Sequence, residues 1–378
     1  MRKIKFGRFK KKSFTLLLSF LQTRVETEFL YSLGYKKLRE VTRKITFNAI
    51  VDEQKLSQSN FIMHILRLNR YDFASNNNNI INIWNLDDDY YNKSELEGHT
   101  DLVNCIIKLD DKLIASGSLD KSVKIWNFKT AKCEDTIKGF SGFSLALIKL
   151  TKNKFALASD DGSILIYEFK LGVNTKTLEG SSSLRVYNII KLSDNQLASG
   201  SLDFSIKVWD FHSGECLKTL RDCTENLASI IKLNENKIAI SAKDKKIKIW
   251  DFSSKNDNLT IIDIGKIGNV YGFIKLTEKN YASRNSDKSI GIWDFFSGEC
   301  LKTLHGHLEN IHCLIKLNEK QIISGSSDTS IKIWNFSSGE CIKTLTGYSK
   351  EVYCLMKLNE RQILSGGGAN IINIWDLF

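Results

Sequence analysis

Apolar and polar residues alternate in a short segment that recurs along most of the chain. In residues 330–336 (SIKIWNF), Ile331 and Ile333 alternate with Lys332 and Trp334, which is the two-residue period of a β-strand. Copies of this segment occupy residues 80–86, 121–128, 163–169, 204–211, 245–252, 288–295 and 371–377. A segment copied so often predicts one structural unit repeated along the chain.

The spacing of the copies defines the length of the unit. Their aromatic residues, which lie 41 to 43 residues apart, are Trp84, Trp126, Tyr167, Trp209, Trp250, Trp293, Trp334 and Trp375. Around Trp334, residues 311–317, 321–326 and 341–347 add three more β-rich segments, with polar turns between them. A four-stranded sheet of this size cannot bury both of its faces, so neighbouring units must stack and close radially. The pattern therefore predicts an all-β fold across residues 43–378.

These repeats resemble the WD40 family of β-propellers. Gly98-His99 leads to Trp126-Asn127, and Gly306-His307 leads to Trp334-Asn335, which is the Gly-His to Trp-Asp arrangement of a WD40 repeat. The resemblance implies eight blades. Seven blades with one stray repeat is the alternative, since seven is the commoner number in that family.

The same resemblance implies a hydrogen-bonded chain of Trp, Ser, His and Asp that pins each blade. The matching residues are His99, Ser116, Asp120 and Trp126 in the second repeat, and His307, Ser324, Asp328 and Trp334 in the seventh. Such a chain satisfies buried polar groups, so we interpret it as structural and not as a Ser-His-Asp catalytic triad. In the third to sixth repeats and the eighth, the histidine is replaced by Phe140, Ser182, Cys223, Lys266 and Tyr348.

The ring is expected to close through an N-terminal strand. Phe378 follows Trp375 by three residues, so the last repeat lacks a fourth strand. In WD40 proteins this gap is filled from the N-terminal end, and residues 44–51 (KITFNAIV) are β-rich and precede the first repeat. An open ring would expose sheet edges on both sides of the gap.

Most of the net charge of +11 lies in residues 1–44, which include the N-terminal extension, residues 1–42. Residues 1–44 carry 13 basic against 3 acidic side chains, which leaves 41 basic and 40 acidic side chains in the rest. Nucleic acid or an acidic membrane is therefore expected as a partner only through this basic tail. Thr23 and Glu26 form a capping box, and Val25, Phe29 and Leu33 follow at helical spacing, so part of the extension is predicted to be a short helix.

The cysteines follow the repeat and show no zinc-binding spacing. One repeat position holds Cys105, Cys313 and Cys354, and another holds Cys133, Cys216, Cys300 and Cys341. We interpret both sets as small packing residues, with no metal or disulfide. No cofactor is expected, and this cysteine usage favours a reducing compartment, the cytoplasm, with the nucleus as an alternative.

The family resemblance also points to one face of the ring as the binding surface. The positions that face a partner lie 24 and 22 residues before each repeat aromatic, and here they supply Phe143, Arg185, Tyr187, Tyr271, His312 and Tyr353. Tyrosine and arginine dominate protein interface hot spots. Ordinary strand-end aromatics are the alternative interpretation.

A ring of basic residues marks the opposite mouth of the predicted channel. It comprises Arg67, Lys108, Lys149, Lys191, Lys232, Lys275, Lys316 and Lys357. An anion could bind there. Acidic neighbours such as Glu319 and Glu360 favour a solvated, charge-balanced ring instead.

These observations predict a non-catalytic scaffold, monomeric by itself, that binds other proteins or peptides. The alternative is the substrate-recognition subunit of a ubiquitin ligase. That alternative is weakened because residues 1–42 show no F-box start and Arg185 is the only arginine at the predicted contact positions. No enzyme is expected, because the sequence shows no converging carboxylates, metal ligands or phosphate loop.

Overall fold

The computed structural model describes residues 46–48, 61–86, 92–138, 140–179, 184–221, 223, 225, 227–252, 258–264, 268–348, 350–368 and 371–377. The chain divides into residues 1–45, which lie outside the described residues, and the unit Thr46–Phe378. The predicted helix and basic tail of residues 1–42 therefore lie outside the description.

The described strands form eight four-stranded antiparallel sheets, which we number as blades 1 to 8 in chain order. Blade 1 consists of β2 (Ile65–Arg67), β3 (Asp72–Asn77), β4 (Ile80–Asn85) and β5 (Asn92–Leu96), and blade 2 of β6 (Val103–Lys108), β7 (Leu113–Ser118), β8 (Val123–Asn127) and β9 (Lys132–Ile137). Blade 3 consists of β10 (Ser144–Lys149), β11 (Lys154–Ser159), β12 (Ser163–Glu168) and β13 (Val173–Glu179), and blade 4 of β14 (Val186–Lys191), β15 (Gln196–Ser201), β16 (Ile206–Asp210) and β17 (Cys216–Leu220). Blade 5 consists of β18 (Leu227–Asn234), β19 (Lys237–Ala242), β20 (Lys246–Asp251) and β21 (Asn258–Asp263), and blade 6 of β22 (Val270–Lys275), β23 (Asn280–Asn285), β24 (Ile290–Asp294) and β25 (Glu299–Leu304). Blade 7 consists of β26 (Ile311–Lys316), β27 (Gln321–Ser326), β28 (Ile331–Asn335) and β29 (Cys341–Leu345), and blade 8 of β30 (Val352–Lys357), β31 (Gln362–Gly367), β32 (Ile371–Asp376) and β1 (Thr46–Asn48).

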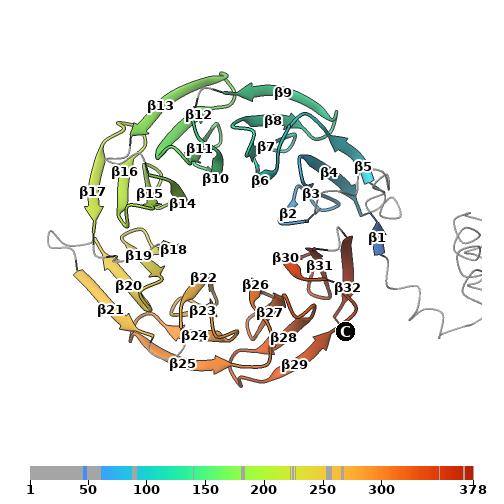
Figure 1. Ribbon diagram of the computed structural model, residues 1–378, viewed down its shortest axis with the longest axis vertical. Coiled ribbons are helices and arrows are strands. Elements are labelled where there is room, and N and C mark those ends of the chain that lie inside the picture. Colours follow the sequence, from blue (N-terminus) through green and yellow to red (C-terminus); the bar gives the residue numbers. More distant parts are fainter. Residues whose placement is uncertain are drawn as a thin grey trace, which may run out of the picture. The chain divides into compact units, whose positions relative to one another are not determined.

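The blades are arranged in a ring around a common axis, with the first strand of each blade innermost (Figure 1). Adjacent blades pack through one buried apolar cluster at each of eight interfaces. Between blades 1 and 2, for example, Ile81 and Ile83 pack with Trp126 and Phe128. The interface between blades 8 and 1, where Leu364 and Ile372 pack with Phe73 and Trp84, has the same character. The ring is therefore continuous, and the seven-bladed alternative is wrong.

Blade 8 takes its fourth strand from the N-terminal end of the ring. Strand β1 pairs antiparallel with β32, with Thr46 opposite Asn373 and Asn48 opposite Ile371. This pairing lies within the predicted segment 44–51, and it confirms the all-β, eight-bladed propeller closed by an N-terminal strand. Within the described residues, no helix is long and apolar enough to cross a membrane.

The turns between the second and third strands place non-glycine residues in the left-handed region. Lys121, Phe204, Lys245, Lys288 and Thr329 have φ values of 60°, 62°, 57°, 68° and 66°. Blade 3 has Gly162 at this position. A bulky aromatic such as Phe204 is the least compatible of these side chains with that backbone conformation.

We expect Phe204→Gly to raise the free energy of unfolding by on the order of 1 kcal/mol, because glycine adopts this φ without a Cβ clash. Phe204→Ala is the matched control, since it removes the same ring but keeps the Cβ. The midpoint of urea unfolding should lie at a higher urea concentration for the glycine variant than for the alanine variant. Equal midpoints would show that the turn stores no backbone strain.

Candidate functional site

The ring has two faces that differ in the loops they carry. The loops that precede the innermost strands, together with the turns between the second and third strands of each blade, form what we call the upper face. The turns between the first and second strands, and between the third and fourth, form the lower face. This arrangement follows from the antiparallel order of the strands in every blade.

A β-bulge lies at the upper end of the innermost strand in each of blades 2 to 8. The pairing register shifts across the second residue of each of these strands, which is Asn104, Leu145, Tyr187, Ala228, Tyr271, His312 or Tyr353. A bulge bends the strand and redirects the side chain of the extra residue. Four of the six predicted partner-binding residues are therefore bulge residues. The other two, Phe143 and Arg185, directly precede β10 and β14.

The six predicted residues form two groups on the upper face. The first belongs to blades 3 and 4, where Phe143 and Tyr187 are half-buried and Arg185 is exposed. Lys121 of blade 2 lies 5.8 Å from the centre of the Phe143 ring. Arg185 forms an ion pair with Asp160 of blade 3. This group is thus partly held by contacts within the ring.

The second group belongs to blades 6, 7 and 8. The His312 ring lies 4.8 Å from the Tyr353 ring in an edge-on arrangement, and a ring nitrogen of His312 lies 2.6 Å from the Ser327 hydroxyl. Tyr271 is 40% exposed. His312 and Tyr353 line an open cavity of about 340 Å³, whose lining residues belong to blades 1, 6, 7 and 8. That volume is within the range of natural ligand pockets.

The cavity also contains a residue that the sequence reasoning missed. The Arg284 guanidinium lines it and donates hydrogen bonds to the main-chain oxygens of Tyr271, Ile311 and His312. Burial lowers the pKa of Arg284 from its ordinary value. The sequence contained a signal for Arg284, which lies nine residues before the repeat aromatic of blade 6. In the other blades from 2 to 8 this position holds a small residue: Gly117, Ala158, Gly200, Ser241, Gly325 or Gly366.

The basic ring on the lower face is largely charge-balanced. Lysines and acids three residues apart pair as Lys108–Asp111 (3.2 Å), Lys191–Asp194 (2.8 Å), Lys275–Glu278 (2.9 Å), Lys316–Glu319 (2.8 Å) and Lys357–Glu360 (2.5 Å). Arg67 donates to the Leu358 main-chain oxygen at 2.6 Å, which joins blades 1 and 8. These partners favour the charge-balanced interpretation over an anion site.

Blades 2 and 7 each contain a complete buried hydrogen-bond chain. In blade 7, the Trp334 indole donates to the Ser324 hydroxyl at 2.8 Å, and the two ring nitrogens of His307 lie 2.7 Å from Ser324 Oγ and 2.7 Å from Asp328 Oδ2. In blade 2, His99, Ser116, Asp120 and Trp126 make the same contacts, all at 2.7 Å. Ser116 and Ser324 are fully buried and accept a bond from tryptophan, so neither hydroxyl can reach a substrate. Each of these hydrogen-bond chains links the strands and the preceding loop of its own blade.

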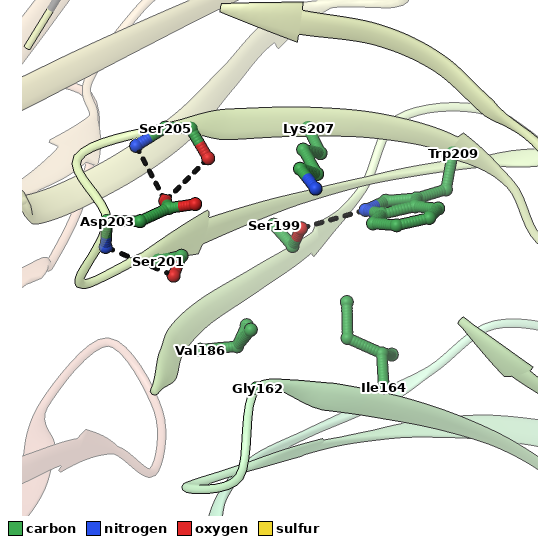
Figure 2. A pocket seen from close by; sticks show the side chains of 9 residues that line it. All are labelled: Gly162, Ile164, Val186, Ser199, Ser201, Asp203, Ser205, Lys207 and Trp209. Carbon is green, nitrogen blue, oxygen red and sulfur yellow. Dashed lines mark hydrogen bonds between the residues drawn. The ribbon is translucent and has the colours of Figure 1, made fainter. Parts of the chain in front are cut away.

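In other blades a different residue occupies the histidine position, and the hydrogen bonds differ. In blade 8, the Tyr348 hydroxyl donates to the Ser365 main-chain oxygen at 2.6 Å and lies 3.1 Å from Ser365 Oγ, which accepts from Trp375. In blade 4, Ser199 accepts from Trp209 and Asp203 accepts from Ser205, with a cavity of about 10 Å³ beside them (Figure 2). A space of that size holds a single water molecule. The residue at the histidine position of blade 4, Ser182, lies outside the described residues.

Acidification is expected to destabilise the ring in two steps. Burial lowers the pKa of His99 and His307 below 6.5. As the pH falls, the unfolded chain therefore binds protons on these histidines before the folded chain does, and this favours unfolding. Their contribution is present above about pH 6.5 and is lost as the pH falls below it. Burial alone would raise the pKa of Asp328, but hydrogen bonds from Ser330, Leu308 and His307 lower it to about 2. A further loss should therefore occur as the pH falls from about 4 to about 2.

Urea midpoints measured from about pH 7 to about pH 5 check the first step. The His307→Phe variant should show a shallower decline than the native protein over this range. A slope that the substitution leaves unchanged would remove His307 as a source of the pH dependence.

All eight cysteines are free, and they differ in exposure. Cys223 and Cys354 are buried, and Cys105 and Cys313 are half-buried. The prediction that both repeated sets pack in the interior is wrong for Cys133, Cys216, Cys300 and Cys341, which are exposed. Each of these four lies at or near the start of the outermost strand of its blade, where no further strand covers it. Across the described ranges no group of three or more His, Cys, Asp or Glu residues could hold a metal ion.

Comparison with known proteins gives one family match and several short likenesses. Residues 91–127, 172–210, 298–335 and 339–376 match the family model described as WD domain, G-beta repeat. The Neurospora crassa protein named probable E3 ubiquitin ligase complex SCF subunit scon-2 is 45% identical over 47 residues, which cover 12% of this chain and 7% of that protein. The human protein named DDB1- and CUL4-associated factor 13 is 42% identical over 52 residues, which cover 13% of this chain and 12% of that protein. The matches therefore span a small part of these relatives, little more than one repeat.

A solved structure supports the architecture. The crystal structure of the computationally designed Ika8 protein aligns with a TM-score of 0.73 at 23% identity, and the alignment covers 84% of this chain and 97% of that chain. At this level of identity, the likeness concerns the fold alone.

Proposed function

The chain is a WD40-repeat β-propeller, and on that premise we propose that it is a non-catalytic scaffold that binds other proteins or peptides on the upper face of its ring. A ring of this kind positions side chains on rigid strands, and its eight interfaces leave little freedom at the strand ends. The upper face thus offers a preformed surface at low entropic cost to binding.

The observation that supports this proposal most is the set of bulge residues. Tyr187, Tyr271, His312 and Tyr353 occupy the same bulge in four blades, while Asn104, Leu145 and Ala228 occupy it in the other three. A bulge leaves the extra residue out of the ladder and redirects its side chain. Large amphipathic residues at such positions suit protein recognition.

A triple variant tests the proposal. Tyr187→Ala, Tyr271→Ala and Tyr353→Ala together should reduce the recovery of bound partners by roughly tenfold or more, because each removes a large contact side chain. The matched control is Tyr71→Ala, Leu171→Ala and Phe296→Ala, which removes three exposed apolar side chains from the lower face. Quantitative mass spectrometry of captured proteins should show partners lost from the first variant and retained by the second. Equal recovery from both would refute binding at the upper face.

The second candidate is the substrate-recognition subunit of a ubiquitin ligase. The names of the relatives described above favour it, but their likeness extends over 47 and 52 residues, which is the length of a repeat and not of a ligase-binding domain. The test is whether the captured proteins include ligase components such as DDB1 or CUL4. Their absence from the captured proteins would leave the scaffold without a ligase role.

The basic composition of residues 1–42 suggests a third candidate function, the binding of nucleic acid or acidic lipid. Nucleic acid or acidic lipid bound through residues 1–42 should be released by moderate salt and lost when these residues are deleted. Binding that survives the deletion belongs to the ring.

A further inference from the structure

We propose that the cavity beside Arg284 binds a carboxylate of a partner peptide, supplied by an acidic side chain or by a C-terminus. This inference rests on the proposed function, because it names the chemistry that part of the upper face recognises. It depends on one departure from the repeat, in blade 6, and on what that departure does to the lining of the cavity.

In blade 6 the larger residue of one cross-strand pair lies on the second strand and the smaller residue lies on the innermost strand, the reverse of blades 2, 7 and 8. In blades 2, 7 and 8, a cysteine on the innermost strand opposes a glycine on the second strand, as in Cys313 opposite Gly325. In blade 6, Gly272 opposes Arg284. The glycine of the second strand is closely packed elsewhere: a Cβ at Gly325 would lie 2.6 Å from Val352 of the next blade. The long side chain of Arg284 must therefore leave this interface, and the absence of a side chain at Gly272 gives it room.

Gly272 makes room for one edge of the guanidinium. A Cβ at Gly272 would lie 2.9 Å from Nη2 and 3.2 Å from Nε of Arg284. Both Arg284 and Gly272 line the cavity. The edge formed by Nε and Nη2 therefore occupies the space that a side chain fills in the other blades, at the lining of the cavity. This is the edge with which an arginine grips a carboxylate through two parallel hydrogen bonds.

The donors of this edge are not all used within the ring. Arg284 has five N–H groups, and its bonds to the Ile311, His312 and Tyr271 oxygens involve only Nη1 and Nη2, the last at 3.2 Å. In the part of the chain that the structure describes, Nε has no acceptor and the guanidinium has no ion pair with a carboxylate. A half-buried cation held only by main-chain oxygens lacks a counter-charge, which an incoming anion would supply.

The surrounding residues favour a singly charged ligand with an apolar body. Burial and the nearby Arg284 charge lower the pKa of His312, although Glu351 raises it, so His312 is neutral near pH 7. Burial also lowers the pKa of His64, which lines the same cavity. Among the described residues that line the cavity, Arg284 is thus the one cation, and it matches one carboxylate better than a dianionic phosphate. Met63, which is 42% exposed, and the half-buried Phe273 line the same space and suit the apolar atoms of a peptide.

The test uses the full chain and three synthetic peptides. The first is a pentapeptide, capped at both ends, with glutamate between two phenylalanines. The second carries glutamine in place of the glutamate. The third is a tripeptide that is capped at its N-terminus and has a free C-terminal carboxylate. Calorimetry should show the native protein binding the glutamate or the free-carboxylate peptide about tenfold more tightly than the glutamine peptide. Comparison of the two acidic peptides identifies which source of carboxylate fits.

The matched variant exchanges the pair, Gly272→Cys with Arg284→Gly, and so installs the cysteine and glycine that blades 2, 7 and 8 already carry. We expect it to fold with a urea midpoint near that of the native protein and to lose the preference for a carboxylate. Arg284→Lys keeps the charge without the two-pronged edge and should retain only part of the preference. A preference that survives the exchange, or a native protein that does not distinguish glutamate from glutamine, overturns the proposal.

Two further outcomes separate this inference from its premise. Acetate that displaces the glutamate peptide at equal concentration would show that a free anion is the ligand, which overturns the peptide part of the proposal. If the triple tyrosine variant loses partners but the native protein shows no carboxylate preference, carboxylate binding in the cavity is refuted. The proposed scaffold function then still stands.

Discussion

Deletion of residues 1–48 is expected to lower the free energy of unfolding by roughly 2–4 kcal/mol relative to deletion of residues 1–45, because only the longer deletion removes the ladder hydrogen bonds of β1. Strand β1 comprises only Thr46–Asn48, yet it supplies the outermost strand of blade 8. The two chains differ by three residues, so the basic extension is absent from both. Urea unfolding and size-exclusion chromatography together measure the effect.

The loss should extend beyond stability. Without β1, the edge of β32 is free to pair with another chain, and the shorter protein should self-associate as its concentration rises. Equal midpoints and equal elution volumes for the two truncated chains would contradict a ring closed by this strand.

His307→Phe should lower the free energy of unfolding by roughly 2–3 kcal/mol. Phenylalanine fills much of the imidazole volume but leaves the Ser324 hydroxyl and the Asp328 carboxylate, whose side chain is 6% exposed, without their partner. Asp328 retains hydrogen bonds from Leu308 and Ser330, which limits the loss. Thermal or urea unfolding measures the change.

The control for this substitution is His305→Phe, two residues away at an exposed position. It should change stability by no more than about 0.5 kcal/mol. His99→Phe should cost as much as His307→Phe, and the two losses should add, because blades 2 and 7 do not touch. A combined loss much smaller than the sum would show that the two chains of hydrogen bonds do not act independently.

The sequence predicted the features that every repeat shares. The spacing of residues such as Trp126 and Trp334 predicted eight repeat units that must stack, because one sheet of this kind cannot exclude water from both faces. The resemblance to WD40 repeats implied that they form eight blades, with seven as the alternative. The pairing of residues 46–48 with β32 was predictable for a similar reason, since a sheet edge left open in a ring is costly.

The features that one repeat alone carries were harder to predict. Arg284 is a single departure at a position occupied by small residues, and its consequence depends on Gly272, twelve residues earlier, and on a neighbouring blade. The offset that marked Tyr271 and Tyr353 carried no information on the bulge that redirects them, because register shifts arise from strand pairing. The exposure of Cys216 was missed because alternation along a strand does not reveal whether another strand covers it.

The most direct test of the ring is a pair of engineered cysteines at Thr46 and Asn373, which lie opposite each other in the antiparallel pair of β1 and β32. Opposite residues in such a pair have Cα atoms close enough for a disulfide. Under mild oxidation, mass spectrometry of the monomer should find residue 46 linked to residue 373, whereas cysteines at Thr46 and Ile371, two residues out of register, should stay largely unlinked. Free thiols in the first variant, or links formed only between molecules, would contradict an eight-bladed ring closed by its own N-terminal strand.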